Sequence, residues 1–259
     1  MKMMAQDIEE TIRGFFEDHL GKISCKGVLG YAKFKDVYDE LMSIQQQRLK
    51  RISADKFDEL VESGSIISFG IAYQDAAIDA INRTKEDGTD YELWNFYSRE
   101  YDRLNRLLNQ TAQAIADRFN GIPITATLNG LTGNVKHVTD YYGLTISHRT
   151  VAEMAGLGWR GKNGLLINEE FSCAIRFASV ITSLTLASLG RIGSQCGVCH
   201  ACEDVCTFIR NRETLPNYRE NCRKYLVHLQ SEGLTHEVCG KCIRACYRNS
   251  IFNEQFNLE

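Results

Sequence analysis

The chain has 259 residues, of which 44% are hydrophobic and 24% charged, and its net charge at pH 7 is −3. These values are typical of a globular protein with one large domain, or with a domain and an appendage. They exclude a uniformly basic surface built for nucleic acid or anionic lipid, and no apolar run approaches the roughly 18 residues that a membrane span needs.

The N-terminal segment predicts an amphipathic helix. Ile8, Ile12 and Phe15 recur at helical spacing among acidic residues, whereas a signal peptide has a basic start followed by an apolar core. We therefore expect a cytoplasmic protein without a membrane partner.

The next 170 or so residues alternate between strand and helix patterns. The predicted strands are 28–34, 65–73, 122–128, 164–168 and 175–184, and the predicted helices are 36–52, 91–119 and 148–155. Ser147 is the expected N-cap of the last helix, and Gly121 is expected to end the long one. This pattern predicts an α/β or α+β body with one sheet.

Residues 156–164, GLGWRGKNG, contain a G-x-G-x-x-G pattern at Gly156, Gly158 and Gly161. A dinucleotide site needs a strand before the glycines and a helix after them. Here the helix comes first and the strand follows, so we exclude a Rossmann site. Two interpretations remain: a helix end with a tight turn that needs positive φ, or a backbone that closely approaches a bulky ligand.

Eight of the ten cysteines lie between residues 196 and 246. Without a secretion signal they are expected to bind metal rather than to form disulfides. They form a C-x2-C-x2-C-x3-C run and a second set that ends in C-x2-C-x3-C. The two sets are Cys196, Cys199, Cys202 and Cys206, and Cys222, Cys239, Cys242 and Cys246.

The first run has the spacing of bacterial ferredoxins, in which the fourth cysteine binds the other [4Fe–4S] cluster. One cluster is therefore expected on Cys196, Cys199, Cys202 and Cys246, and the other on Cys222, Cys239, Cys242 and Cys206. Zinc ribbons, the alternative, would leave the third cysteine of the run without a function. The two remaining cysteines, Cys25 and Cys173, are expected to be buried structural thiols.

The second half of the chain resembles the epoxyqueuosine reductase family, and more distantly the corrinoid reductive dehalogenases. The resemblance is carried by ISHRTVAEMAGLGW, GKNGLLIN, CGVCHACEDVC and CGKCIRAC. The resemblance implies a nitroreductase-like body, residues 1–190, that holds cobalamin without a protein axial ligand. It also implies a ferredoxin-like domain, residues 191–259, whose two clusters reduce the cobalt.

The resemblance further implies site residues. The corrin-binding positions are expected at Ser147, His148, Gly156, Gly158, Trp159, Gly161, Lys162, Asn163 and Arg176. Tyr142 occupies the position of the family's aspartate proton donor and is the expected catalytic acid.

The expected partners follow from the same resemblance. A low-potential donor such as a ferredoxin or flavodoxin would supply electrons, and tRNA would carry the substrate. However, the net charge of −3 and the lack of a helical-repeat extension after Cys246 predict weak tRNA binding or none.

The sequence thus predicts a cobalamin-dependent iron–sulfur reductase of unidentified substrate. An electron-transfer protein that reduces a partner and a zinc-stabilised binding module are the alternatives.

Overall fold

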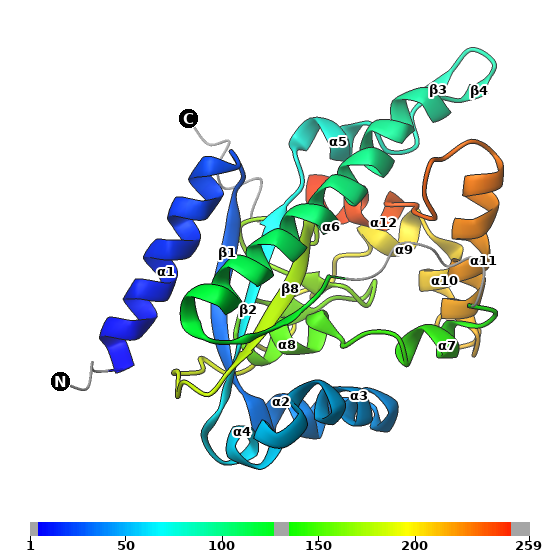
Figure 1. Cartoon of the computed structure of the whole chain (residues 1–259). Coiled ribbons are helices and arrows are strands. Elements are labelled where there is room, and N and C mark those ends of the chain that lie inside the picture. The colour runs from blue at the N-terminus through cyan, green and yellow to red at the C-terminus, as the bar shows by residue number, and fades with distance from the viewer. Residues whose placement is uncertain (1–4, 127–134, 250–259) are drawn as a thin grey trace.

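The computed structural model describes residues 5–126 and 135–249 and is built on one antiparallel sheet (Figure 1). Its strands are β1 (Gly27–Lys33), β2 (Ser65–Ala72), β8 (Ile175–Thr182) and β5 (Ile122–Ile124), in the order β1-β2-β8-β5. Every neighbouring pair is antiparallel. The mixed helix and strand content is confirmed, and the antiparallel sheet makes the architecture α+β.

The two faces of the sheet are buried in separate cores. In β2, Ile67, Phe69 and Ile71 belong to one core, whereas Ile66 belongs to the other. In β8, Val180 belongs to the first core and Ile181 to the second. Successive side chains of a strand point to opposite faces, so a strand that is apolar at most positions needs helices on both sides.

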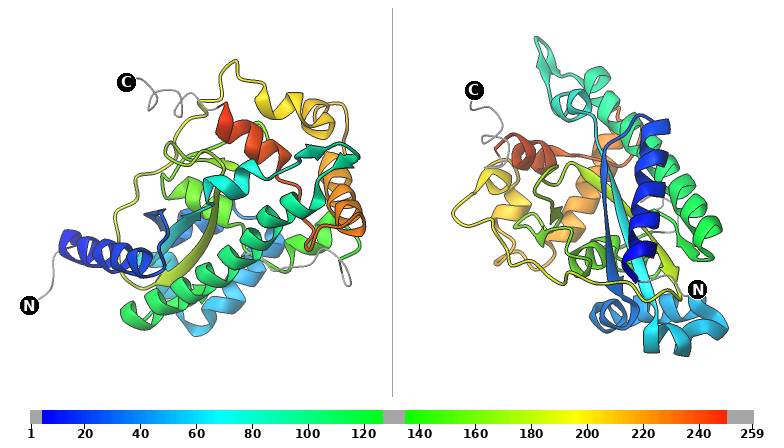
Figure 2. Two further views of the ribbon diagram at one scale, coloured as in Figure 1. Left: turned by 90° about the horizontal axis from the view of Figure 1, so that it is seen from above. Right: turned by 90° about the vertical axis from the view of Figure 1, so that its left-hand side faces the viewer.

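Helices cover each face, as Figure 2 shows. Helices α1 (Ala5–Lys22) and α6 (Tyr91–Phe119) pack on the first face, and α8 (His148–Met154) packs on the second with α2 (Phe34–Glu40), α3 (Ser43–Ser53) and α4 (Phe57–Ser63). The shorter elements are η1 (Ala54–Lys56), α5 (Asp75–Asp79), the β3–β4 hairpin (Thr84–Lys85, Gly88–Thr89), α7 (Val138–Tyr142) and the β6–β7 hairpin (Trp159–Arg160, Leu166–Ile167).

The predicted long helix is confirmed with the same bounds, 91–119. Asp90 caps its first turn by accepting a hydrogen bond from the Leu93 amide, and Asn120 adopts the left-handed conformation at its end. The residue that ends the helix is therefore Asn120 rather than Gly121. Asparagine tolerates this conformation better than other residues with a Cβ.

The predicted helix over 36–52 is two helices. Leu41 and Met42 are extended between α2 and α3, and the break allows both Leu41 and Leu49 to reach the second core. The predicted strand 122–128 is described only as far as Ala126, and Thr127 and Leu128 lie outside the described residues.

The part of the chain from Cys196 onward, which we call the cysteine module, contains four helices within its described residues. They are α9 (Ala201–Asp204), α10 (Thr207–Arg210), α11 (Tyr218–Ser231) and α12 (Lys241–Arg248). Leu229, Leu234 and Val238 join the core that α6 forms on the sheet. The module is thus packed into the body, and a boundary at residue 190 stays a prediction. None of the described helices has the length and apolar character to cross a membrane.

Candidate active site between the body and the cysteine module

A cavity of about 680 Å³ lies where the cysteine module meets the body. The body contributes residues from α6, α7, β8 and the turn at 163–165, and the module contributes residues 205–209, α11 and 236–243. Its walls are mainly apolar, with arginines at several positions. A large cavity with few polar groups is the usual form of a ligand site.

The wall formed by the body is aromatic and holds one buried cation. The guanidinium of Arg176 lies 3.9 Å from the centre of the Tyr101 ring, and its Nε donates to Asn105 Oδ1 at 3.0 Å. Burial raises the pKa of Tyr97, which lines the same wall. Arg176 takes part in none of the ion pairs found among the described residues, and its neighbours on this wall are tyrosines and Asn105.

Helix α7 brings Tyr141 and Tyr142 to the cavity. The Tyr142 hydroxyl accepts a hydrogen bond from Arg219 Nη1 at 3.3 Å. Burial raises the pKa of Tyr141. Asp140, the acidic neighbour, instead caps α7 by accepting from the backbone amides of Lys136 and His137, and these bonds lower its pKa.

A bridge from the module holds α7 in place. Glu220 on α11 accepts a hydrogen bond of 2.7 Å from the Val138 amide, at the first residue of α7. Arg223 forms a 2.7 Å ion pair with the same carboxylate. This ion pair lowers the pKa of Glu220 to about 2. The carboxylate therefore stays charged and keeps its partners.

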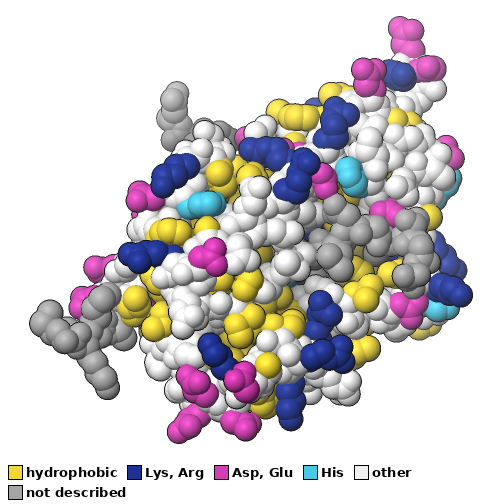
Figure 3. All heavy atoms as spheres, viewed as in Figure 1, with side chains coloured by type: hydrophobic (Ala, Val, Ile, Leu, Met, Phe, Trp, Pro, Cys, Tyr) yellow, Lys and Arg dark blue, Asp and Glu magenta, His cyan; other side chains and the backbone are white. Residues whose placement is uncertain are grey.

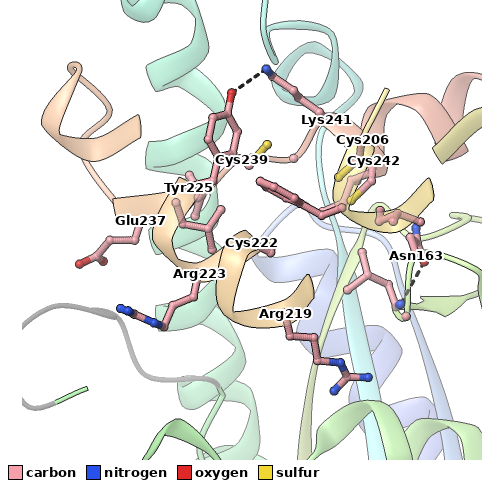
Figure 4. Close-up of a pocket in the computed structure, with 18 of the residues that line it drawn as sticks. Asn163, Cys206, Arg219, Cys222, Arg223, Tyr225, Glu237, Cys239, Lys241 and Cys242 are labelled. Carbon is pink, nitrogen blue, oxygen red and sulfur yellow. Dashed lines mark hydrogen bonds between the residues drawn. The ribbon is translucent and has the colours of Figure 1, made fainter. Parts of the chain in front are cut away.

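Four cysteines form part of the module wall (Figure 4): Cys206, Cys222, Cys239 and Cys242. Burial and the neighbouring cysteines raise the pKa of Cys222 to about 12, and burial raises that of Cys239 to about 11. Lys241 lies between two of them in sequence and donates to Tyr225 Oη at 2.8 Å. Its ammonium is also 5.5 Å from the centre of the Trp94 ring.

The other four cysteines lie outside the cavity wall. Burial, and then the nearby Cys246, raises the pKa of Cys202 to about 11, with smaller effects from Cys196 and Cys199. Cys199 is exposed. Cys239 and Cys206 add to the raised pKa of Cys222, whereas the pKa of Cys242 is raised by burial and then by cysteines that include Cys202 of the other predicted group. The assignment of the eight cysteines to two crossed groups stays a prediction. Within the described part of the chain, no three His, Cys, Asp or Glu side chains form a site for a single metal ion.

Gly156, Gly158 and Gly161 of GLGWRGKNG lie outside the cavity wall, whereas Gly164 lines it. A Cβ on Gly158, which has a φ of +153°, would lie 2.0 Å from the Ile167 carbonyl oxygen. One on Gly156, with φ +71°, would meet Leu189 and Gly190, and one on Gly161 would meet the Ile167 side chain. Their predicted contact with a ligand stays a prediction. The close approach is to the neighbouring protein segments, because the chain folds back into the β6–β7 hairpin.

His148 and Ser147 are also structural in this fold. His148 Nε2 is 2.7 Å from the Thr125 carbonyl oxygen and Nδ1 is 2.9 Å from Ser179 Oγ. Since a carbonyl only accepts, Nε2 carries the proton and Nδ1 accepts from the serine. Ser147 caps α8 by accepting from the Thr150 amide, as predicted. Neither side chain lines the cavity, and both ring nitrogens of His148 have protein partners. The predicted ligand contact of His148 stays a prediction.

Of the other predicted cofactor residues, only Asn163 and Arg176 line the cavity. Trp159 is 2% exposed and packs with Ile167 in a small core. Lys162 donates to the Cys199 carbonyl oxygen at 2.8 Å and so ties the turn to the cysteine module.

Sequence reasoning missed much of the cavity wall. Tyr97, Tyr218 and Arg219 line it, yet none of them is among the predicted site residues. The cluster of basic and aromatic residues around Cys222, in NYRENCRKY, is the one signal that could have indicated Tyr218 and Arg219.

No protein-family model matches the chain. Among curated proteins it is similar to the epoxyqueuosine reductase of Lactococcus garvieae, at 27% identity over 217 residues, which are 77% of this chain and 56% of the relative. It is also similar to the epoxyqueuosine reductase of Leadbetterella byssophila, at 46% identity over 93 residues, 35% of this chain and 30% of the relative. The chain spans about half the length of the first of these relatives.

The similar solved structures are epoxyqueuosine reductases too. That of Bacillus subtilis has a TM-score of 0.44 and 18% identity, covering 80% of this chain and 53% of the other. A second, with a TM-score of 0.42 and 18% identity over the same shares, contains a tRNA-Tyr stem loop modified with epoxyqueuosine. These structural likenesses are distant, and the similarity to curated relatives rests on sequence.

His148 should make stability depend on pH. Burial lowers its pKa from 6.5 to about 4. Because the folded pKa lies below the unfolded one, the neutral ring's contribution is complete above pH 6.5 and is lost as the pH falls toward 4. The expected loss between pH 7 and pH 5 is about 2 kcal/mol. Anaerobic urea unfolding at both pH values should show a smaller difference for His148→Gln, which keeps a donor for Thr125. An equal difference in both proteins would contradict this role.

Proposed function

We propose that the chain is an iron–sulfur reductase of the epoxyqueuosine reductase type, with two [4Fe–4S] clusters and a cobalamin held in the cavity. One observation carries the proposal: Cys206, Cys222, Cys239 and Cys242, one complete predicted ligand group, line the wall of the cavity. A cluster there would deliver electrons directly to a bound group. A protein that only carries electrons has no need for such a cavity.

The chemistry of the cysteines fits a metal cluster. Burial and mutual repulsion disfavour thiolates in the absence of metal, as the raised pKa values of Cys202 and Cys222 indicate. Iron ions supply the positive charge that stabilises thiolates, so cluster binding and the ordering of the module should be coupled.

The cavity also fits a large ring with polar substituents. Its aromatic and aliphatic walls suit the faces of a macrocycle, and Arg149, Asn163 and Arg176 offer donors for amide or phosphate groups. When bound, cobalamin would supply a cobalt centre that is a strong nucleophile in its reduced form.

The chain's own residues would bind substrate, exclude water and supply protons. Reduction of an epoxide to an alkene consumes two electrons and two protons and releases the oxygen as water. Tyr142 is the proposed proton donor, because it lines the cavity and Arg219 donates to its hydroxyl. A guanidinium at that distance stabilises the negative charge that remains on the oxygen after proton transfer.

Epoxyqueuosine in tRNA is the substrate that the similar proteins indicate. On the face in Figure 3, acidic and basic side chains are interspersed rather than gathered by sign. With the net charge of −3, this surface favours weak tRNA binding that depends on a few local contacts.

Anaerobic purification and reconstitution test the function as a whole. We expect a brown protein with roughly eight irons, a change in the cobalamin spectrum on binding, and conversion of epoxyqueuosine in tRNA when a strong reductant is present. Clusters with cobalamin binding but no conversion would refute the substrate alone. Clusters without any effect on cobalamin would favour an electron-transfer protein, and a colourless protein with zinc would overturn the proposal.

The crossed ligation predicts how cysteine variants combine. Cys206→Ala should lose one cluster, so that iron content falls from roughly eight to roughly four per chain. Adding Cys239→Ala should remove little more, because both residues serve the same cluster. Adding Cys199→Ala instead should remove the second cluster too. The opposite pattern, with Cys206 and Cys199 acting as one unit, would show that each run binds its own cluster.

Tyr142→Phe should slow conversion by about 10²- to 10⁴-fold, the usual contribution of a positioned acid. Cobalamin binding and iron content should be unchanged, because the ring is kept and only the hydroxyl is lost. Tyr141→Phe, on the same short helix and the same wall, is the matched control and should have a small effect. Equal losses in the two variants would mean that neither hydroxyl is the specific donor.

A further inference from the structure

Ser172 lies in a tight turn just before β8 and has an unusual backbone. Its φ is +50°, in the left-handed region. Residues with a Cβ rarely adopt this conformation, whereas glycine adopts it readily. The side-chain oxygen of Asn168 fixes the turn by accepting hydrogen bonds from the backbone amides of Glu170 and Phe171. The backbone amide of Asn168 donates to the Ser172 carbonyl oxygen at 2.8 Å. The turn itself does not use the serine hydroxyl.

That hydroxyl reaches a cysteine of the module. Ser172 is 1% exposed, and its Oγ lies 3.1 Å from Cys246 Sγ. The next residue, Cys173, packs in the same small apolar cluster as Cys246, and its thiol lies 3.9 Å from the Ile243 carbonyl oxygen, to which it donates. The Cys173 thiol is 3% exposed and is itself held by Asn163 Nδ2 at 3.4 Å. A serine hydroxyl and a buried cysteine from the body therefore lie against one sulfur of the module.

We propose that Ser172 and Cys173 position Cys246 and raise the reduction potential of the cluster that Cys246 completes. This inference rests on the proposed function, since it requires that cluster. A sulfur bound to iron carries no proton and can only accept, so the serine hydroxyl must donate to it. Donors to cluster sulfurs stabilise the reduced form, which has one more negative charge.

The proposal explains why a strained position holds serine. Glycine would suit the backbone but would remove the hydroxyl, and alanine would keep the strain without the hydrogen bond. It also explains a buried thiol, Cys173, that belongs to neither predicted ligand group. Both are positioning residues that act through Cys246.

Redox titration of the anaerobically reconstituted protein tests the proposal, with EPR spectra to follow each cluster. In Ser172→Gly and Ser172→Ala, one of the two clusters should become harder to reduce. At its wild-type midpoint, the ratio of reduced to oxidised cluster should fall about three- to tenfold, where tenfold corresponds to about 59 mV for a one-electron couple. Ser172→Cys keeps a weaker donor and should give a smaller shift.

The control is Ser53→Ala, which removes an equally buried hydroxyl that bonds the Leu49 carbonyl oxygen within α3, outside the cysteine module. It should leave both midpoints unchanged. Full iron content with unaltered midpoints in the Ser172 variants would overturn the proposal. If the Ser172 variants do not load clusters, Cys173→Ala provides the same readout without the strained backbone, and an unshifted midpoint there would overturn it equally. Wild-type protein without clusters would refute the proposed function itself, which is a distinct outcome.

Discussion

The site depends on one contact between the body and the turn before α12. Trp94, which is 1% exposed, donates from its indole nitrogen to the Cys239 carbonyl oxygen at 2.9 Å. A buried indole N–H needs an acceptor, so the helix that covers the sheet and the turn that carries Cys239 are fixed relative to each other. Because α12 begins two residues later, this bond also sets where Cys242 and Cys246 lie.

Helix α12 connects the two cysteine groups. Cys242 lines the cavity, whereas Cys246 contacts Ser172 and lies with the outer group. The two residues are one helical turn apart, so the distance between the groups is set by helix geometry rather than by a loop. Rigid spacing of this kind is what transfer of electrons from one centre to another requires.

The regular elements of the body could be predicted because hydrophobic periodicity determines them locally. The helical pattern of residues 91–119 indicated α6, and the strand pattern of 65–73 indicated β2. The crossed grouping of the cysteines follows from their spacing, and four of them, Cys206, Cys222, Cys239 and Cys242, line one cavity wall; the ligation itself stays a prediction. The contacts of Gly158 and His148 could not be predicted. They depend on how segments that are distant in the sequence fold back against these residues. The cavity was missed for the same reason: α6, α7, β8 and α11 contribute to it from positions far apart in the sequence.

The Glu220 bridge has a consequence for how such a protein could be assembled from parts. Helix α7 has five residues, too few to be stable alone, and its first amide is held by a carboxylate from the module. The module also completes the core under α6 with Leu229, Leu234 and Val238. The cysteine module is therefore not interchangeable. Replacing it with an unrelated domain would leave the body with an exposed apolar face and would remove the carboxylate that holds the helix carrying Tyr141 and Tyr142. Recombination in this fold would have to transfer both halves together.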